Sequence, residues 1–405
     1  MDIRDKIGRS ALHAVCATHS FGYEGHRVDI AKLLINKICG VYDLDDAGQS
    51  ALHDACKEDN SGIVKPLLQN KFDVDQRDKL GETPLHIAWY TGNVALVEIL
   101  LRNKCVVDEC DNLNKAPFFL ACEGGHKDVV KSLMNFICNM NIRDKIGRSA
   151  LHAVCAIPSI GYEDFDRGVV HVAELLINKR CSVDDLDDAG QSALHSACKE
   201  DNLEMVELLL KNKFDVDQRD KMDETPIFNA CRGYPNNAFA LELLIKRNCD
   251  VNVLNINGLN ALNIAFDSGC IRKISMETHF KRGVKLLVDS GCSVNICDTN
   301  GQTPLHRACS EGYVDVAELF LKRNSNINQC DKLMKTPLIL AVEGRHTEVV
   351  TMLVENKCDI DISDKDGRTA LDIAEENRVV DIKNILLNVM KKDTNAHDEC
   401  TKKAK

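Results

Sequence analysis

The stretch DKLGETPLHIAWYTG, residues 78–92, contains the signals that decide the fold of this chain. Its opening Asp-x-x-Gly is typical of a tight turn, because Asp bonds to nearby backbone amides and Gly accepts a positive φ. Thr83 can cap a helix, and Pro84 suits the first helical position, where no backbone donor is needed. The stretch therefore predicts a turn followed directly by a helix.

The same pattern recurs along the whole chain, and six of the ten intervals between copies are 33 residues long. Ser, Thr or Asn holds the capping position in ten of eleven copies, and Pro or Ala always follows it. Such a period is the mark of a solenoid built from stacked units. The units start near residues 5, 45, 78, 111, 144, 187, 220, 255, 298, 331 and 364.

A second helix follows the first in each unit. It is visible as apolar residues at three- and four-residue spacing, for example Val94, Val97 and Leu101. Between one helix pair and the next runs a polar stretch such as FDVDQRDKLGE, residues 72–82. No single helix pair can bury its own apolar face, so we expect the stacking of neighbours to stabilise the fold.

The residues Thr-Pro-Leu-His-x-Ala, intact at 83–88 and 303–308, resemble the ankyrin repeat signature. This resemblance implies an all-α solenoid with short β-hairpin fingers, in a curved array of about eleven ankyrin repeats. It also implies that the concave side, formed by the fingers and the inner helices, binds other proteins. We expect one elongated domain over residues 1–390 and a flexible, charged tail at 391–405.

The composition argues against several functional classes. The net charge is -11 and Lys and Arg are scattered, so we expect no nucleic acid, which would need a basic stripe. No segment approaches the roughly 18 apolar residues that cross a bilayer, and no apolar signal core is present, so we expect no membrane insertion. Because catalytic motifs are absent, we expect no enzyme activity, no cofactor and no small-molecule substrate.

The cysteines fall mainly into two slots of the repeat and form no Cys-x-x-Cys pair. We interpret them as small buried hydrophobes, with redox or metal chemistry as the alternative. Free thiols predict a reducing compartment, the cytoplasm or the nucleus. The first slot holds Cys16, Cys56, Cys122, Cys155, Cys198, Cys231 and Cys309, and the second holds Cys39, Cys105, Cys138, Cys181, Cys249, Cys292 and Cys358.

A series of histidines recurs at the period of the repeat, so its members lie about 10 Å apart or more, too far to share a metal ion. We expect each ring to bond to the neighbouring turn, and we expect no metal site. Trp89 takes a slot otherwise filled by Cys, which favours core packing over an exposed anchor. The series comprises His13, His53, His86, His152, His195 and His306.

Some units depart from the pattern. We interpret extra residues at 18–27, 157–168 and 271–282 as loops between the two helices of a unit, either folded back or in contact with a partner. Pro66 lies in a second helix and predicts a kink or a late helix start. The turn Gly is replaced at three places, where a positive φ would strain Met most, namely Asn114, Asp223 and Met334.

Two segments of the chain are duplicated. Residues 2–17 recur at 141–156 with Asp2 replaced by Asn141, and residues 43–60 recur at 185–202 with Asp54 replaced by Ser196. The pattern indicates that a block of four units has been copied and that only a loop changed its length.

Six of the predicted finger tips present a sizeable apolar side chain two places after the opening Asp, and five of these follow a Lys such as Lys79. We expect them to bind an apolar, acidic protein segment, together with helix-end residues such as Tyr90. The alternative is that neighbouring tips pack against each other. The tips are Ile7, Leu80, Leu113, Ile146, Met222 and Leu333.

The resemblance also implies a modification by an iron-dependent asparaginyl hydroxylase, which acts where Asn follows Asp-Val with Leu eight residues earlier. Asn252 meets this pattern and Asn295 meets it in part. The leading hypothesis for function is a non-catalytic scaffold or adaptor. The alternative is the ankyrin segment of a larger membrane channel, receptor or enzyme, because the first unit lacks a polar cap and suggests an array that extends upstream.

Overall fold

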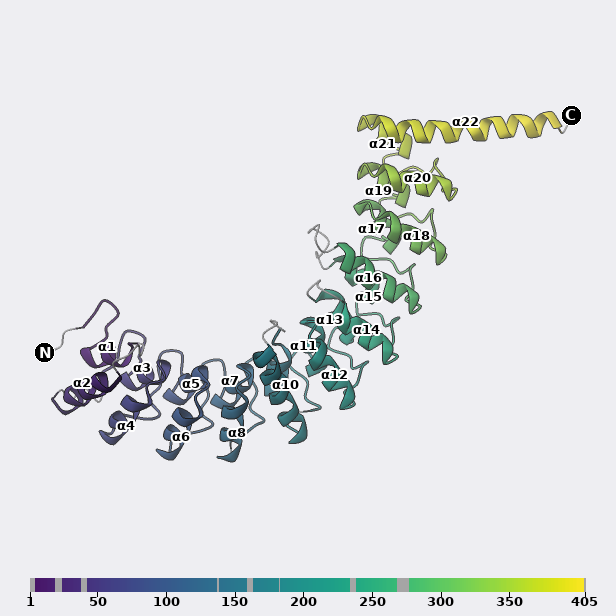
Figure 1. The fold of residues 1–405 in the computed structure, drawn as a ribbon. Helices are drawn as coiled ribbons and strands as arrows, with labels where there is room; N and C mark the ends of the chain where they lie inside the picture. The colour runs from purple at the N-terminus through teal and green to yellow at the C-terminus, as the bar shows by residue number, and fades with distance from the viewer. Residues whose placement is uncertain are drawn as a thin grey trace. The chain divides into compact units, whose positions relative to one another are not determined.

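The computed structural model describes residues 4–18, 24–37, 42–136, 138–158, 163–181, 183–233, 238–267 and 277–403. These residues form two compact units, Met1–Asp215 and Val216–Lys405. The sequence predicts one continuous array, and its continuity and curvature across this boundary stay a prediction. Both units consist of helix pairs that alternate with loops (Figure 1).

The N-terminal unit contains a first and a second helix in each repeat. The first helices are α1 (Ala11–Cys16), α3 (Ala51–Lys57), α5 (Pro84–Ala88), α7 (Pro117–Glu123), α9 (Ala150–Cys155) and α11 (Ala193–Lys199). The second helices are α2 (Glu24–Lys37), α4 (Ser61–Gln69), α6 (Val94–Arg102), α8 (Lys127–Asn135), α10 (Glu163–Asn178) and α12 (Leu203–Lys211). A short 3-10 helix, η1 (Trp89–Thr91), follows α5.

The C-terminal unit repeats this arrangement. Its first helices are α13 (Pro226–Arg232), α15 (Ala261–Asp267), α17 (Pro304–Glu311), α19 (Pro337–Glu343) and α21 (Ala370–Glu376). Its second helices are α14 (Phe239–Lys246), α16 (Glu277–Asp289), α18 (Val314–Lys322), α20 (Thr347–Glu355) and α22 (Val380–Lys403). Helix α22 includes residues 391–403, where the sequence predicts a flexible tail, and the mobility of that stretch stays a prediction.

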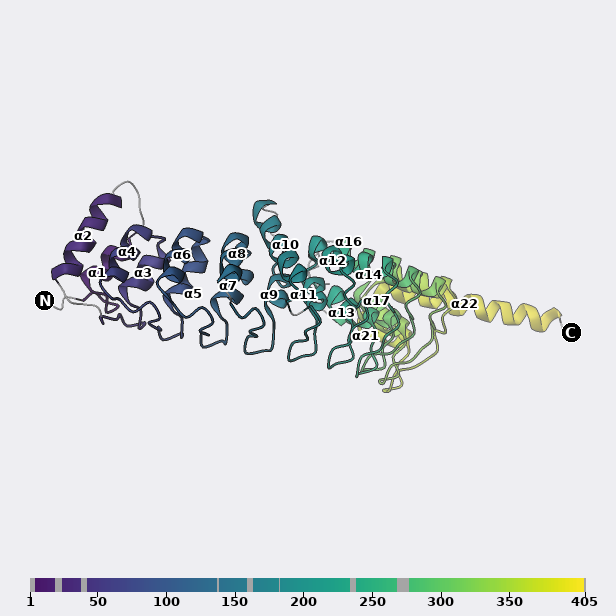
Figure 2. The same cartoon turned by 90° about the horizontal axis from the view of Figure 1, so that it is seen from below.

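Within each unit the helices form two layers, because every helix packs against its own partner and against the equivalent helix of the next repeat. In the N-terminal unit the first helices lie between the second helices and the loops, which project to one side (Figure 2). Leu85 and Leu100 are among the fully buried side chains at these contacts. Burying such a side chain contributes about 1.5–3 kcal/mol, so the stacking of repeats supplies the core.

The loops that lead into the first helices, called fingers below, are closed by their opening Asp. In the finger at residues 78–82, Asp78 Oδ1 accepts hydrogen bonds from the amides of Leu80 at 2.8 Å and Glu82 at 2.9 Å. The Asp78 amide donates to the Glu82 carbonyl at 2.9 Å. One such pair is too short for a strand, and the described residues contain only an isolated bridge between Leu44 and Ser50. The expected β-hairpins are therefore not confirmed.

The positions that replace the turn Gly all adopt a positive φ, which is 60° at Asn114, 57° at Asp223 and 58° at Met334. Lys71 and Lys104 are also left-handed, with φ values of 64° and 63°. A residue with a Cβ loses about 1–2 kcal/mol in this conformation, and Asn and Asp tolerate it better than Met. The expectation of strain at Met334 therefore rests on an observed backbone angle.

Two predicted irregularities need correction. Of the kink or late start expected from Pro66, the late start is excluded, because α4 begins at Ser61 and Asn60 Oδ1 accepts from the Ile63 amide at 3.3 Å, and the kink stays a prediction. The extra residues are not entirely loops, since α2, α10 and α16 have 14, 16 and 13 residues where α6 has nine. Residues 24–27, 163–168 and 277–282 are helical, and the remainder of each insertion lies largely outside the described residues.

Candidate functional site

Main-chain hydrogen bonds couple the fingers of adjacent repeats. In many fingers the residue after the opening position donates its amide to a carbonyl of the preceding finger. Asn112 donates to Leu80 at 2.8 Å, Lys145 to Leu113 at 3.0 Å, and Lys365 to Leu333 at 3.0 Å. The amides of Leu80, Leu113 and Leu333 donate to the opening Asp at 2.8 Å, so both main-chain groups of these tips are engaged.

All six predicted tips are exposed in the structure. Their exposed fractions run from 42 % at Met222 to 63 % at Leu80. Adjacent fingers contact each other through the backbone and through polar side chains such as Lys79 and Asn112, and the alternative of tips packed against one another stays a hypothesis. Ile7, Leu80, Leu113 and Ile146 belong to the N-terminal unit, and Met222 and Leu333 belong to the C-terminal unit.

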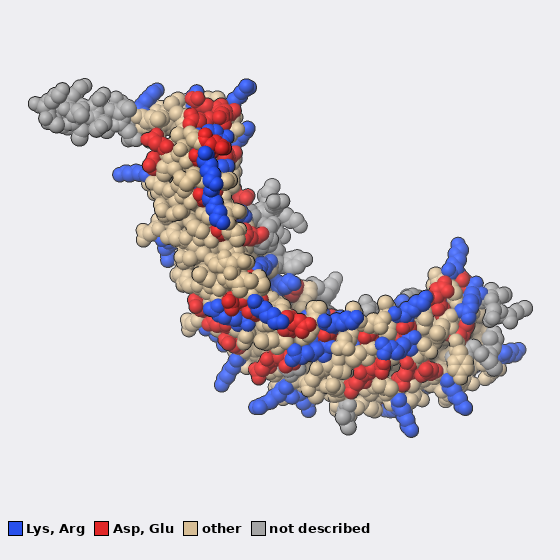
Figure 3. Space-filling view, turned by 180° about the vertical axis from the view of Figure 1, so that it is seen from behind, with Lys and Arg blue, Asp and Glu red and all other residues tan. Residues whose placement is uncertain are grey.

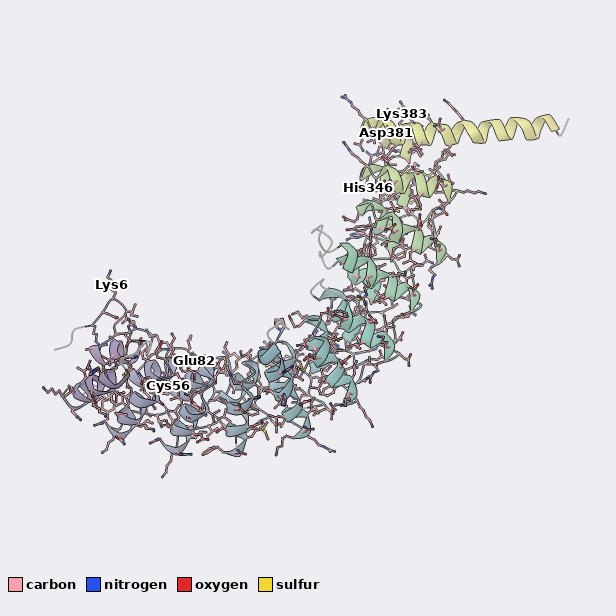
Figure 4. The ribbon with its side chains drawn as sticks, viewed as in Figure 1. Lys6, Cys56, Glu82, His346, Asp381 and Lys383 are labelled. Atoms are coloured by element: carbon pink, nitrogen blue, oxygen red, sulfur yellow. The ribbon has the colours of Figure 1, made fainter. Side chains whose placement is uncertain are left out.

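The lysines before the tips are not all directed at solvent. The Lys79 ammonium donates to the Asp46 carbonyl of the preceding finger at 2.6 Å, and Lys332 donates to the Thr299 carbonyl at 2.7 Å. These positive charges lie over the preceding finger and help to couple it to the next. Lys6 extends away from the helices in Figure 4, which also places Cys56 within the helical layer.

Ion pairs join the ends of several first helices to the fingers that precede them, and the two residues of each pair are eight places apart in the chain. Lys115 pairs with Glu123 at 2.6 Å, and Lys335 pairs with Glu343 at 2.7 Å. The Asp78 repeat has Glu82 and Tyr90 at these two positions. Burial raises the pKa of Glu82, and the charges of Asp78 and Asp111 add to the rise. The Tyr90 side chain lies outside the described residues.

The histidine series joins each first helix to the next finger, as expected. His86 Nδ1 accepts from the Thr83 amide at 3.0 Å, and Nε2 donates to the Lys115 carbonyl at 3.2 Å. A carbonyl can only accept, so Nε2 carries a proton, and an amide N–H can only donate, so Nδ1 does not. The ring is therefore neutral. Burial lowers the pKa of His86, against the opposing effect of the carbonyl and of Asp111. Equivalent bonds are made by His13, His53, His152 and His306.

The cysteines of the two slots are mostly buried and are not disulfide-bonded in the described part of the chain. Burial raises the pKa of Cys105 to about 12, which keeps its thiol protonated and unreactive. Cys231 and Cys358 are half-buried, and Cys39 lies outside the described residues. This supports the interpretation of these residues as small hydrophobes.

Trp89 is half-buried rather than fully enclosed. Its ring lies 5.8 Å from that of His126, and a Cβ added at Gly124 would come within 2.5 Å of it. Gly124 is therefore needed for the approach of Trp89 to the next repeat. Trp89 is larger than the Cys that fills this slot in most other repeats. At this residue the α-helix α5 has already ended, at Ala88, and a 3-10 helix follows.

Asn252 and Asn295 connect the loops of adjacent repeats. Asn252 Oδ1 accepts from the Ser293 amide at 2.9 Å, and its Nδ2 donates to the Gly291 carbonyl at 3.1 Å. Asn295 Oδ1 accepts from the Asn326 amide at 3.3 Å. Both residues are exposed, and their carboxamides bridge two repeats.

The charge distribution offers no single-sign stripe on the face drawn in Figure 3, where Lys and Arg alternate with Asp and Glu over both units. Within the described ranges, no three potential ligands among His, Cys, Asp and Glu gather closely enough to hold a metal ion. Among those same residues no helix is long and apolar enough to cross a membrane.

The sequence pattern missed exposed apolar residues on the fingers, among them Ile256. Ile256, which is 57 % exposed, stands one place after Asn255, whereas the predicted tips stand two places after the opening residue. The Ile256 amide donates to the Met222 carbonyl at 3.0 Å, which places it beside a predicted tip. A search for apolar residues at either finger position would have found it.

Comparison with protein-family models agrees with this geometry. The model for ankyrin repeats (3 copies) matches residues 1–78, 59–144, 132–220, 227–331, 273–364 and 320–398. A search of curated proteins gave no significant match. Since the matched segments cover nearly the whole chain and the structure has the expected helix pairs, the chain belongs to the ankyrin repeat family.

Proposed function

We propose that this chain is a non-catalytic scaffold that binds a protein partner through its finger tips and the adjoining ends of its first helices. The observation that carries the proposal is the set of exposed apolar tips on fingers that are fixed by backbone hydrogen bonds. Ankyrin repeats in general mediate protein–protein interactions, and the coarse function follows from family membership.

The tips are suited to this role because they are rigid and apolar. A partner that buries one Leu or Ile tip gains on the order of 1 kcal/mol from the hydrophobic effect. The fingers are ordered before binding, so little conformational entropy is lost on contact. We expect an affinity built from several modest contacts, with a few tips dominating.

The test is affinity purification of partners from cell extract, with cross-linking mass spectrometry to locate the contact. Cross-links from Lys6 and Lys145 are expected, since these residues adjoin tips. Replacing Ile7, Leu80, Leu113 and Ile146 together with Ser should abolish capture and leave the circular dichroism spectrum unchanged.

A matched control removes three exposed apolar side chains away from the tips. Ile30, Leu33 and Val106 are 47, 59 and 48 % exposed, and their joint replacement by Ser should preserve capture. Retention of the same cross-linked partners by the tip variant would contradict the proposal, as would loss of capture in the control alone.

We also propose that Asn252, and less completely Asn295, are hydroxylation sites, as the family resemblance implies. Both carboxamides are exposed where they bridge repeats. Intact mass spectrometry after incubation with the active asparaginyl hydroxylase should show added oxygen in the unmodified chain and none in an Asn252→Ala, Asn295→Ala variant. An unchanged mass of the unmodified chain would remove this proposal. The free buried thiols support location in a reducing compartment such as the cytoplasm.

A further inference from the structure

The N-terminal unit contains the same surface twice. Residues 5–17 are identical to 144–156, and residues 43–60 differ from 185–202 only at Asp54 and Ser196. Both copies lie within the compact unit Met1–Asp215. We call residues 5–17 with 43–60 the first copy, and residues 144–156 with 185–202 the second copy.

The two copies have matching contacts as well as matching sequences. The amide of Asp46 donates to the Ile7 carbonyl at 3.1 Å, and the amide of Asp188 donates to the Ile146 carbonyl at 3.0 Å. The histidine bonds also match, at 3.0 Å for His13 to the Gln49 carbonyl and 2.9 Å for His152 to the Gln191 carbonyl.

The ion pairs at the base of each copy correspond in the same way. Arg9 pairs with Asp5 at 2.9 Å and Arg148 pairs with Asp144 at 2.8 Å. The arginine that precedes each finger reaches across to the next repeat, from Arg4 to Asp43 and from Arg143 to Asp185. The backbone and the side chains that fix each surface are therefore equivalent.

The exposed groups of the two copies are the same. Ile7 is 51 % exposed and Ile146 is 55 % exposed. The preceding Lys6 and Lys145 are exposed, as are Asp46 and Asp188 on the following finger. The single difference inside the copies does not alter this surface, because Asp54 is buried.

We propose that the two copies are equivalent sites for one linear peptide segment, so that a single chain binds two copies of its partner. This inference rests on the proposed function of the finger tips. Physically, two surfaces with the same groups in the same geometry must have similar affinity for the same segment. Residues that flank the copies differ and will modulate that affinity.

The charges on each copy define the chemistry of the segment. Asp5 and Asp144 are engaged by arginine and by finger amides, which leaves Lys6 or Lys145 on one side of the apolar tip and Asp46 or Asp188 on the other. A complementary peptide carries a carboxylate, then an apolar side chain, then a cation. This order fixes its direction along the fingers.

The sites are four repeats apart, which corresponds to about 40 Å at roughly 10 Å per helix layer. A flexible linker of about 50 residues has an average span of this size, whereas one of about five residues cannot reach. A partner with two copies of the segment on a long linker should therefore bind with avidity, about 10²-fold or more above the single segment.

The probe for the experiment is a displayed library of linear twelve-residue peptides. It is first depleted on a full-length Ile7→Ser, Ile146→Ser variant and then selected on the unaltered chain. Enriched peptides should contain a carboxylate, an apolar side chain and a cation, in that order. Isothermal titration of one synthetic peptide should give two peptides bound per unaltered chain, one for either single variant, and none for the double variant.

Two further variants make the assignment independent of the apolar tips. Lys6→Glu and Lys145→Glu should each remove one of the two binding events. Leu333→Ser, outside both copies, should leave two. Circular dichroism should be unchanged in all of them, since every altered side chain is exposed.

The outcomes separate this inference from the proposed function. One peptide per unaltered chain, lost on altering a single tip, would overturn the two-site inference and leave the finger-tip function standing. Binding unaffected by any tip variant, or a selection that enriches no peptide over the double variant, would count against both. An equal affinity of the tandem peptides with long and short linkers would also overturn the inference.

Discussion

Replacing Asp54 with Ser should stabilise the first repeats at neutral pH and remove a specific pH dependence. Asp54 lies in α3 with 6 % of its surface exposed, and its Oδ2 atom has no hydrogen-bond partner in the described part of the chain. The equivalent position in the duplicated block is Ser196, so this helix environment is known to accept the smaller side chain.

The magnitude follows from the pKa of Asp54. Burial raises it from 3.8 to about 6, with His13, Arg9 and Lys57 opposing the rise and Asp45 adding to it. The unfolded carboxyl releases its proton near pH 3.8 and the folded one near 6, so the folded state binds more protons between these values. Stability therefore falls as pH rises through this window, and the full loss above pH 7 is about 3 kcal/mol.

The assay is urea denaturation monitored by the fluorescence of Trp89, the single Trp of the chain, which lies in the repeat next to Asp54. At pH 7.5 the Asp54→Ser variant should be more stable by up to about 3 kcal/mol. At pH 5.0 the difference should narrow to about half of this, because most of the folded carboxyl is then protonated. Titrating groups that do not interact with Asp54 are common to both proteins and cancel in the difference.

The reverse exchange is the matched control. Ser196→Asp introduces the carboxyl at the half-buried equivalent position and should destabilise the chain at pH 7.5 and less at pH 5.0. The reasoning is refuted if the difference between unaltered chain and Asp54→Ser is the same at both pH values. A variant less stable than the unaltered chain at pH 7.5 would show that Asp54 makes a favourable contact.

Three further predictions concern the turn, the bridging His and the thiols. His306→Ala should lower the free energy of unfolding by about 1–3 kcal/mol in urea, since the Lys335 carbonyl loses its donor. Burial lowers the pKa of His306, so its contribution is present above pH 6.5 and should disappear as pH falls. Met334→Gly should raise the free energy of unfolding by about 0.5–1 kcal/mol by relieving a positive φ. Iodoacetamide should modify exposed Cys297 before buried Cys309, as followed by mass spectrometry.

Each of these has a contrary result. Acid should lower the free energy of unfolding of the unaltered chain more than that of His306→Ala. If it does not, the hydrogen bond between His306 and the Lys335 carbonyl contributes little to stability. Gly301→Ala is the control for the turn, because its Cβ would lie 3.1 Å from the Lys332 amide and should destabilise it. If Met334→Gly also destabilises the chain, Met334 is not strained. Equal labelling rates for the two thiols would show that the helical layer opens readily.

The repeat, the helix pairs and the closed fingers could be predicted from the amino-acid sequence. These features depend on residues a few places apart. Asp78 closes its own finger, and Thr83 and Pro84 start the helix that follows, so their positions in the chain were sufficient. The apolar tips could be predicted for the same reason, because a side chain at a fixed place in a short turn points in a fixed direction.

Features that depend on the neighbouring repeat could not be predicted in this way and are seen in the folded chain. It placed the proton of His86 by bringing the Lys115 carbonyl to Nε2, and it directed the Lys79 ammonium back to Asp46. The burial of Asp54 likewise depends on helices from adjoining repeats. Comparison with the duplicate position, Ser196, therefore could not predict that the Asp54 carboxylate is buried. Local pattern fixes geometry within a turn or a helix, whereas burial and pairing are properties of surfaces that meet only when the repeats stack.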